Sequence, residues 1–152
     1  MEYAACLERL ERLCSRAEYC SADLYRKALK DLEGDAEAAA AVVAELKAQR
    51  YVDDARYAAA FAREKASLQG WGPVKIRFQL RGKGIGEADI NAALAEVEPE
   101  KAAGKLERLL EAKYRSLQED PQWRLKLIKF ALSRGYEYDA VQAALEHMKN
   151  SS

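Results

Sequence analysis

Apolar residues recur along the chain at the spacing of α-helices. Near the start, Tyr3, Leu7, Leu10 and Cys14 are separated by four, three and four residues, which places their side chains on one face of a helix. No segment alternates apolar and polar residues for long enough to indicate a strand. Alanine, leucine, glutamate, lysine and arginine dominate the composition, and these residues favour helices. The pattern therefore predicts an all-α protein.

The apolar pattern also repeats about every fifty residues. Residues 80–97, LRGKGIGEADINAALAEV, align with residues 131–148, ALSRGYEYDAVQAALEHM, so that Gly84 matches Gly135. A weaker copy precedes the first of these segments by the same interval. Three short helices bury little apolar surface alone, so stacked copies are expected to share a core in an elongated, curved array of right or left hand. We predict three tandem three-helix repeats, at residues 1–50, 51–99 and 100–152.

Capping and breaking residues set the expected helix ends. Ser21 is a candidate N-cap, Asp53 or Asp54 can cap the helix that follows, and Pro73 suits the first turn of a helix. Glycines at 82, 84 and 86 are expected to end that helix. After the first apolar stripe, the predicted helices lie near residues 21–31, 35–48, 54–68, 73–82, 87–97, 100–116, 120–133 and 137–149.

Positive charge is concentrated in the second repeat, although the chain has 25 basic and 25 acidic residues. From Arg63 to Lys83 the only acid is Glu64. On a helical wheel, Ile76 and Leu80 share the expected buried face. The basic run therefore predicts a cationic surface beside a buried stripe.

An aromatic residue accompanies this charge. Phe78 aligns with Lys27 and Lys129 of the other repeats, so it is expected to face water. An exposed aromatic between arginines resembles an interface hot spot. The alternative is a solvated charged face, with Phe78 and Trp71 folded against the next repeat, and Trp71 could be either a core plug or a hot spot. The candidate partner-binding residues are Arg63, Lys65, Trp71, Lys75, Arg77, Phe78, Arg81 and Lys83.

The helix–turn–helix pattern of the second repeat raises the question of DNA reading. In such motifs the second helix enters the major groove and its N-terminal residues contact bases and phosphates. Here that helix begins with Glu87 and Asp89, and no Lys or Arg occurs before Lys101. Phosphates would repel this helix, which argues against sequence-specific recognition. A weak non-specific contact between DNA and the preceding basic helix stays an alternative.

Signals for catalysis or cofactor binding are poor. The only histidine is His147, and the "GKG" of residues 82–84 lacks the pattern of a nucleotide-binding loop. Cys6, Cys14 and Cys20 lack the spacing of a zinc site and are expected to be free thiols in a reducing compartment. No secretion signal is visible, and the longest apolar run is too short to cross a bilayer. We expect a cytoplasmic, monomeric, non-enzymatic protein without metal or cofactor.

Two segments together resemble a known family. YVDDARYAAAFAREK, residues 51–65, and GWGPVKIRFQLRGKGI, residues 70–85, are similar to the signature of the RecX family of bacterial regulatory proteins. The third repeat also resembles the C-terminal repeat of that family. Phe78 and Gly82 stand where typical members have polar residues, and Val74 where many have arginine. These departures make the surface more apolar and favour contact with protein over contact with DNA.

The resemblance implies a fold and a function. The implied fold is a curved array of three-helix repeats. The implied function is a modulator that binds the RecA recombinase filament on single-stranded DNA, lies in its helical groove and restrains its activity. Recombination, DNA repair and the SOS response would be affected. Two alternatives are a non-specific nucleic-acid-binding repeat protein and a helical scaffold for another protein.

Overall fold

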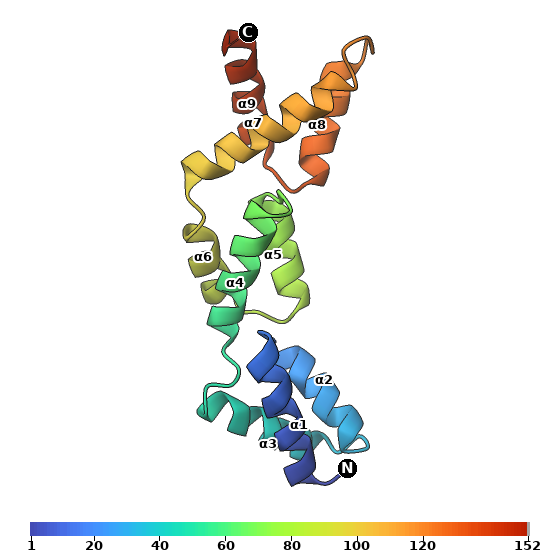
Figure 1. Ribbon diagram of the computed structural model, residues 1–152, viewed down its shortest axis with the longest axis vertical. Coiled ribbons are helices and arrows are strands. Elements are labelled where there is room, and N and C mark those ends of the chain that lie inside the picture. The colour runs from blue at the N-terminus through green and yellow to red at the C-terminus, as the bar shows by residue number, and fades with distance from the viewer. Residues whose placement is uncertain (152) are drawn as a thin grey trace. The chain divides into compact units, whose positions relative to one another are not determined.

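The structure is a computed structural model that describes residues 1–151, and this range contains helices and no strands (Figure 1). The predicted all-α fold is therefore confirmed. No helix in the described range combines the length and the apolar character needed to cross a membrane. The helices are α1 (Tyr3–Arg16), α2 (Ser21–Asp31), α3 (Ala36–Ala48), α4 (Asp54–Ser67), α5 (Pro73–Gly82), α6 (Glu87–Ala95), α7 (Pro99–Arg115), α8 (Trp123–Ser133) and α9 (Tyr138–Ser151).

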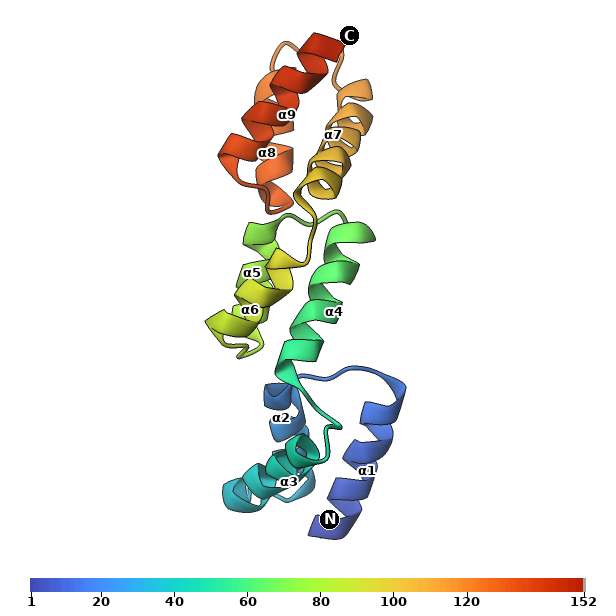
Figure 2. The same cartoon turned by 90° about the vertical axis from the view of Figure 1, so that its left-hand side faces the viewer.

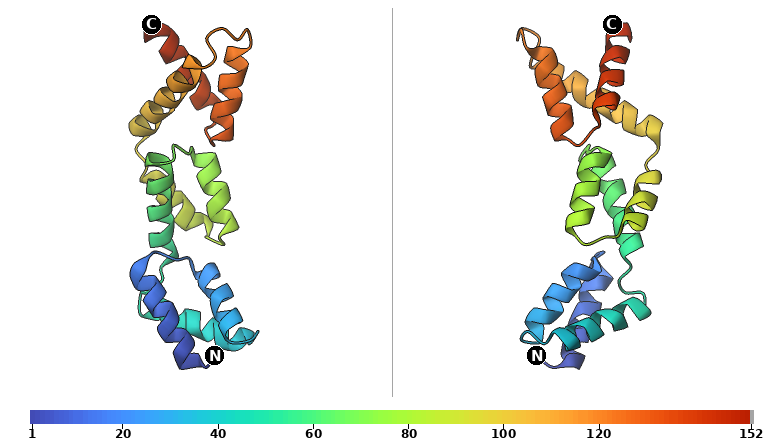
Figure 3. Two further views of the ribbon diagram at one scale, coloured as in Figure 1. Left: turned by 45° about the vertical axis from the view of Figure 1, so that its right-hand side comes forward. Right: turned by 180° about the vertical axis from the view of Figure 1, so that it is seen from behind.

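Helices α1, α2 and α3 contact one another around a shared apolar core, and so do α7, α8 and α9 (Figure 2). Leu10 of α1, Leu24 of α2 and Leu46 of α3 are fully buried in the first group. Leu110 of α7 and Leu127 of α8 are fully buried in the group formed by α7, α8 and α9. The two views of Figure 3 show each of these groups from other sides. The three-helix unit predicted from the apolar period is thus present.

The chain divides into two compact units. One contains residues 1–60 and 80–92, and the other contains residues 61–79 and 93–152. Helices α4, α5 and α6 contribute to both units, so the second repeat is divided between them. The repeat boundaries at 51–99 and 100–152 and the curvature of the array stay predictions.

The helix ends follow the sequence signals with two exceptions. The expected cap at Ser21 is wrong, because Cys20 occupies the N-cap position and Ser21 is the first residue of α2. The backbone N–H and the hydroxyl of Ser21 both donate to Asp54, at 2.8 and 2.6 Å. A carboxylate far along the chain therefore supplies the cap. Helix α8 begins at Trp123, later than expected, because Asp120 accepts from the backbone N–H of Gln122 in a turn before the helix.

The turn after α8 packs against the start of α5 through backbone atoms. The N–H of Gly72 donates to the carbonyl of Arg134 at 2.8 Å, and the N–H of Val74 donates to the carbonyl of Gly135 at 2.9 Å. The hydroxyl of Tyr136 donates to the carbonyl of Gly70 at 3.0 Å in a buried position. The two backbone bonds satisfy N–H groups that a helix start leaves without partners, and the Tyr136 hydroxyl adds a bond to a carbonyl just before the helix. We call this arrangement of residues 70–75 and 134–136 the α5 joint.

A related contact occurs one repeat earlier. Gly84, with a φ of +78°, lies in the turn after α5, and a Cβ at this position would be 3.4 Å from the Cβ of Ala22 at the start of α2. In the same turn, the Lys83 ammonium donates to Asp23 of α2 at 2.9 Å. Gly84 is the residue that aligns with Gly135. The sequence period therefore corresponds to a repeated packing of a turn on a helix start.

Candidate partner-binding site

Helix α5 has one buried face and one open face. Ile76 and Leu80 are 1% and 0% exposed, whereas Val74 and Phe78 are 51% and 72% exposed. At 100° per residue, Phe78 points away from the direction shared by Ile76 and Leu80. The expectation that Phe78 faces water is therefore confirmed.

Two arginines share the open face. Val74, Arg77, Phe78 and Arg81 stand at i, i+3, i+4 and i+7, the spacing of one helical face. We call these four residues the outer face of α5. Sequence reasoning singled out three of them, and Val74 could have been found from the same spacing.

Trp71 lies beside two cations rather than on the outer face. The indole is half-buried and meets the Phe61 ring edge-on, with ring centroids 6.1 Å apart and planes at 67°. The Lys75 ammonium is 4.4 Å from the indole centroid, and the Lys65 ammonium is 5.0 Å from it. Cation–π attraction stabilises such placements. Trp71, Lys65 and Lys75 therefore form one cluster in which the indole is already partly covered.

Three cations of the basic run pair with acidic residues that lie outside the run in sequence. Arg63 pairs with Glu96 at 3.4 Å, and Arg81 pairs with Glu87 at 2.5 Å. The hydrogen bond to Glu87 raises the pKa of the Arg81 guanidinium above its ordinary value. The run contains a single acid, Glu64, in sequence, but acids from outside it lie beside its cations in space.

Lys83 is positioned in the turn after α5, away from the outer face. Its hydrogen bond to Asp23 raises the pKa of the Lys83 ammonium above its ordinary value. Partial burial opposes ionisation of Asp23, but accepted hydrogen bonds, that of Lys83 foremost, leave the pKa of this carboxyl lowered. Lys83 therefore contributes to packing on α2, which the sequence did not reveal.

The outer face of α5 and the cluster around Trp71 present aromatic, apolar and cationic groups. Among residues 1–149, no group of three or more His, Cys, Asp or Glu side chains is arranged to hold a metal ion. Cys6, Cys14 and Cys20 are free thiols, and burial raises the pKa of each. His147 is exposed on α9, and its Nδ1 lies 2.7 Å from Oε1 of Glu107 on α7. An exposed aromatic flanked by cations is suited to contact a macromolecule.

Comparison with known proteins gives the family. Residues 53–94 match the family model for "RecX, second three-helix domain", and residues 104–145 match "RecX, third three-helix domain". "Regulatory protein RecX" of Bacillus mycoides (strain KBAB4) is 33% identical over 111 residues, which are 72% of this chain and 41% of that protein. The namesake of Limosilactobacillus reuteri (strain DSM 20016) is 36% identical over 98 residues, 64% of this chain and 37% of that protein. The chain thus spans about two fifths of the length of these relatives.

Solved structures agree in fold. "Crystal structure of regulatory protein RecX" has a TM-score of 0.86 at 27% identity, and the alignment covers 95% of this chain and 71% of that one. RecX from Lactobacillus salivarius has a TM-score of 0.87 over 97% of this chain and 96% of that one, and its 18% identity bears on the fold alone. With both three-helix domains matched in order and relatives above 30% identity, the chain belongs to the RecX family of regulatory proteins.

Proposed function

We propose that the protein binds the RecA recombinase filament on single-stranded DNA and inhibits or remodels it, and so modulates recombination, DNA repair and the SOS response. Membership of the RecX family is the observation that carries this proposal, because the relatives bear the name of regulatory proteins. The protein would act in the cytoplasm, as a monomer and without catalysis of its own.

The outer face of α5 is the proposed main contact. Phe78 is 72% exposed on α5, and burial of such a side chain in a partner contributes about 1.5–3 kcal/mol. Interface hot spots are enriched in aromatic residues and arginine. Val74 enlarges the apolar patch beside Phe78, since the two residues are one turn apart.

The charges on this face favour a protein surface with acidic groups. Arg81 and Glu87 are 57% and 54% exposed in their side chains, and an exposed pair of this kind contributes about 0–1 kcal/mol. Arg81 can therefore exchange Glu87 for an acid of the partner at little cost. Charged groups at such a surface set orientation and association rate more than affinity.

The first test is co-sedimentation with recombinase filaments on single-stranded DNA, together with titration of the protein into the DNA-dependent ATPase of the recombinase. We expect stoichiometric co-sedimentation and a change in ATPase rate. A protein that stays in the supernatant and leaves the ATPase unchanged would refute the proposed function. Recovery of a different protein, without recombinase, in a pull-down would point to a scaffold instead.

The second test locates the contact. Phe78→Ala should weaken filament binding about tenfold to a hundredfold, the effect of losing about 1.5–3 kcal/mol of buried apolar contact. Tyr138→Ala is the matched control, because Tyr138 is an exposed aromatic of α9, 56% exposed and outside the proposed contact. Equal binding by both variants and the unmodified protein would exclude the outer face of α5 as the main contact.

A further inference from the structure

Helix α7 carries a second cationic surface that is separate from α5. Lys101, Lys105, Arg108 and Arg115 stand at i, i+4, i+7 and i+14, within about 80° of the helix circumference. Lys105 is half-buried, and the other three side chains are exposed. Five acids balance five cations over residues 96–115, so the net charge of this segment is zero, and the stripe is visible only from the helical spacing.

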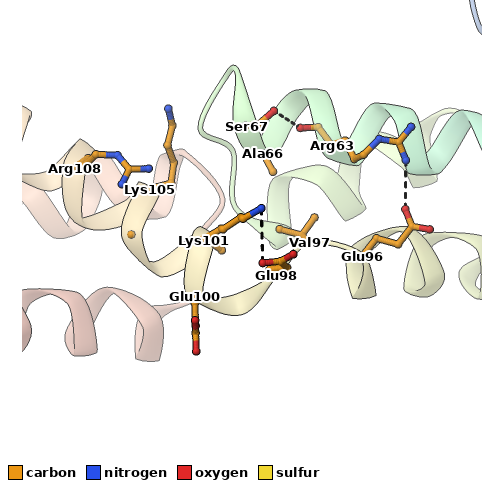
Figure 4. A pocket seen from close by; sticks show the side chains of 12 residues that line it. Arg63, Ala66, Ser67, Glu96, Val97, Glu98, Glu100, Lys101, Lys105 and Arg108 are labelled. Carbon is orange, nitrogen blue, oxygen red and sulfur yellow. Dashed lines mark hydrogen bonds and ion pairs between the residues drawn. The ribbon is translucent and has the colours of Figure 1, made fainter.

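The stripe borders a pocket that α4 closes from the opposite side. The pocket has a volume of about 490 Å³, and its polar lining includes Arg63 and Ser67 of α4 as well as Lys101, Lys105 and Arg108. Figure 4 shows Lys105 and Arg108 extending from neighbouring turns of α7, with Arg63 on the helix across the pocket. Cations thus approach this space from two helices.

The acids at this pocket neutralise only part of the charge. Glu96 pairs with Arg63 at 3.4 Å, and Glu98 pairs with Lys101 at 3.8 Å. Both pairs are long and exposed, so they contribute little and can be exchanged. Glu100 also lines the pocket. Within the described residues, Lys105, Arg108 and Arg115 have no acidic partner at ion-pair distance.

We propose that the cationic stripe of α7, together with Arg63, binds the sugar–phosphate backbone of a single-stranded nucleic acid. The stripe extends along the helix for about 21 Å from Lys101 to Arg115, which suits a linear polyanion. Backbone-tracking grooves of this kind are typical of proteins that bind single strands.

An acidic protein surface fits this stripe less well. Stable protein interfaces centre on buried aromatic or apolar anchors. The large apolar side chains that are exposed within the described residues lie outside α7. Binding with little base preference is also predicted, because the one aromatic residue of α7, Tyr114, is half-buried and its ring packs edge-on against Trp123. The outer face of α5 has such an anchor, so the two surfaces are suited to different partners.

The test uses the full chain without any recombinase, so its result is independent of the proposed function. Binding of a fluorescent oligothymidylate of roughly twenty nucleotides is followed by anisotropy at several salt concentrations. The variant combines Lys105→Gln, Arg108→Gln and Arg115→Gln. Its matched control combines Arg12→Gln, Arg16→Gln and Lys47→Gln, which remove the same charge from exposed positions of α1 and α3.

The expected result is a change in both affinity and salt dependence. Each lost phosphate contact should reduce the slope of log Kobs against log salt by about 0.7, so the α7 variant should show a slope shallower by about 2. Its affinity at low salt should fall by about tenfold or more, while the control keeps the slope of the unmodified protein. Arg108→Lys with Arg115→Lys should bind normally, because phosphate contacts require charge rather than the guanidinium fork.

Three outcomes would overturn the inference. The first is an unmodified protein that does not bind the oligonucleotide at low salt. The second is an α7 variant whose circular dichroism matches that of the unmodified protein and whose slope is unchanged. The third is tighter binding of duplex DNA, or binding of polyglutamate in place of the oligonucleotide through the same three residues, which would assign the stripe to a duplex or to an acidic protein.

Discussion

Replacement of Gly72 by alanine should open the α5 joint. A Cβ at Gly72 would lie 2.5 Å from the carbonyl carbon and oxygen of Gly135 and 2.6 Å from the backbone nitrogen of Tyr136. These atoms belong to the backbone, so no rotation of a flexible side chain relieves the clash. The turn of residues 134–136 must therefore move away from the start of α5.

The magnitude follows from the bonds that this movement breaks. The joint contains two backbone hydrogen bonds, from Gly72 at 2.8 Å and Val74 at 2.9 Å, and the buried bond from Tyr136 at 3.0 Å. Each contributes about 0.5–1.5 kcal/mol net. Gly72→Ala should therefore lower the free energy of unfolding by about 2–4 kcal/mol.

Urea denaturation measures the loss, and amide hydrogen exchange locates it. The N–H of Val74 should lose protection in Gly72→Ala, because its acceptor, the carbonyl of Gly135, moves away. Gly82→Ala is the matched control at the other end of the same helix, since nothing lies within 4 Å of a Cβ there, and it should be neutral or stabilise by up to about 1 kcal/mol. A Gly72→Ala protein with an unchanged urea midpoint and a protected Val74 amide would refute the reasoning.

Three further predictions concern the compact unit of residues 1–60 and 80–92. Asp54→Ala should lower the free energy of unfolding by about 1–2 kcal/mol, because it removes the acceptor of both Ser21 bonds, and Ser21→Ala should have a smaller effect in the same urea titration. Lys83→Met should lower the urea midpoint at neutral pH. The difference from the unmodified protein should vanish as pH falls through the folded-state pKa of Asp23, which lies below its ordinary value, because the pair stabilises only while that carboxyl is ionised. Cys14, half-buried and with a raised pKa, should react first among the thiols with iodoacetamide, and slowly at neutral pH; fast modification would contradict this assignment.

Local signals predicted most of the helices. The bounds of α2 at Ser21–Asp31 and the start of α5 at Pro73 agree with the structure. These ends depend on apolar spacing, on proline and on glycine, which act within a few residues of chain. The orientation of Phe78 was also predictable, since it follows from helical spacing once Ile76 and Leu80 are known to be buried.

Contacts between distant residues could not be predicted in this way. Asp54 caps α2 from 33 residues further along the chain, and nothing in its neighbourhood distinguishes it from Asp53, which caps its own helix. The acidic partners of Arg63 and Lys83 lie 33 and 60 residues away in sequence. The repeat alignment matched Gly84 with Gly135, but equivalence in a repeat does not say which surface each glycine touches.

The α5 joint separates two roles that the segment GWGPVKIRF combines. Gly70, Gly72 and Val74 contribute backbone atoms to the joint, so the start of α5 is held against the turn of residues 134–136 without help from exposed side chains. The direction in which Phe78 points is then fixed by the backbone. Loss of partner binding in Phe78→Ala should accordingly occur at full stability and reflect lost contact. Loss of binding in Gly72→Ala should accompany lost stability and reflect a reoriented helix. Measurements of stability and of binding on both variants therefore distinguish residues that contact the partner from residues that hold α5 in place.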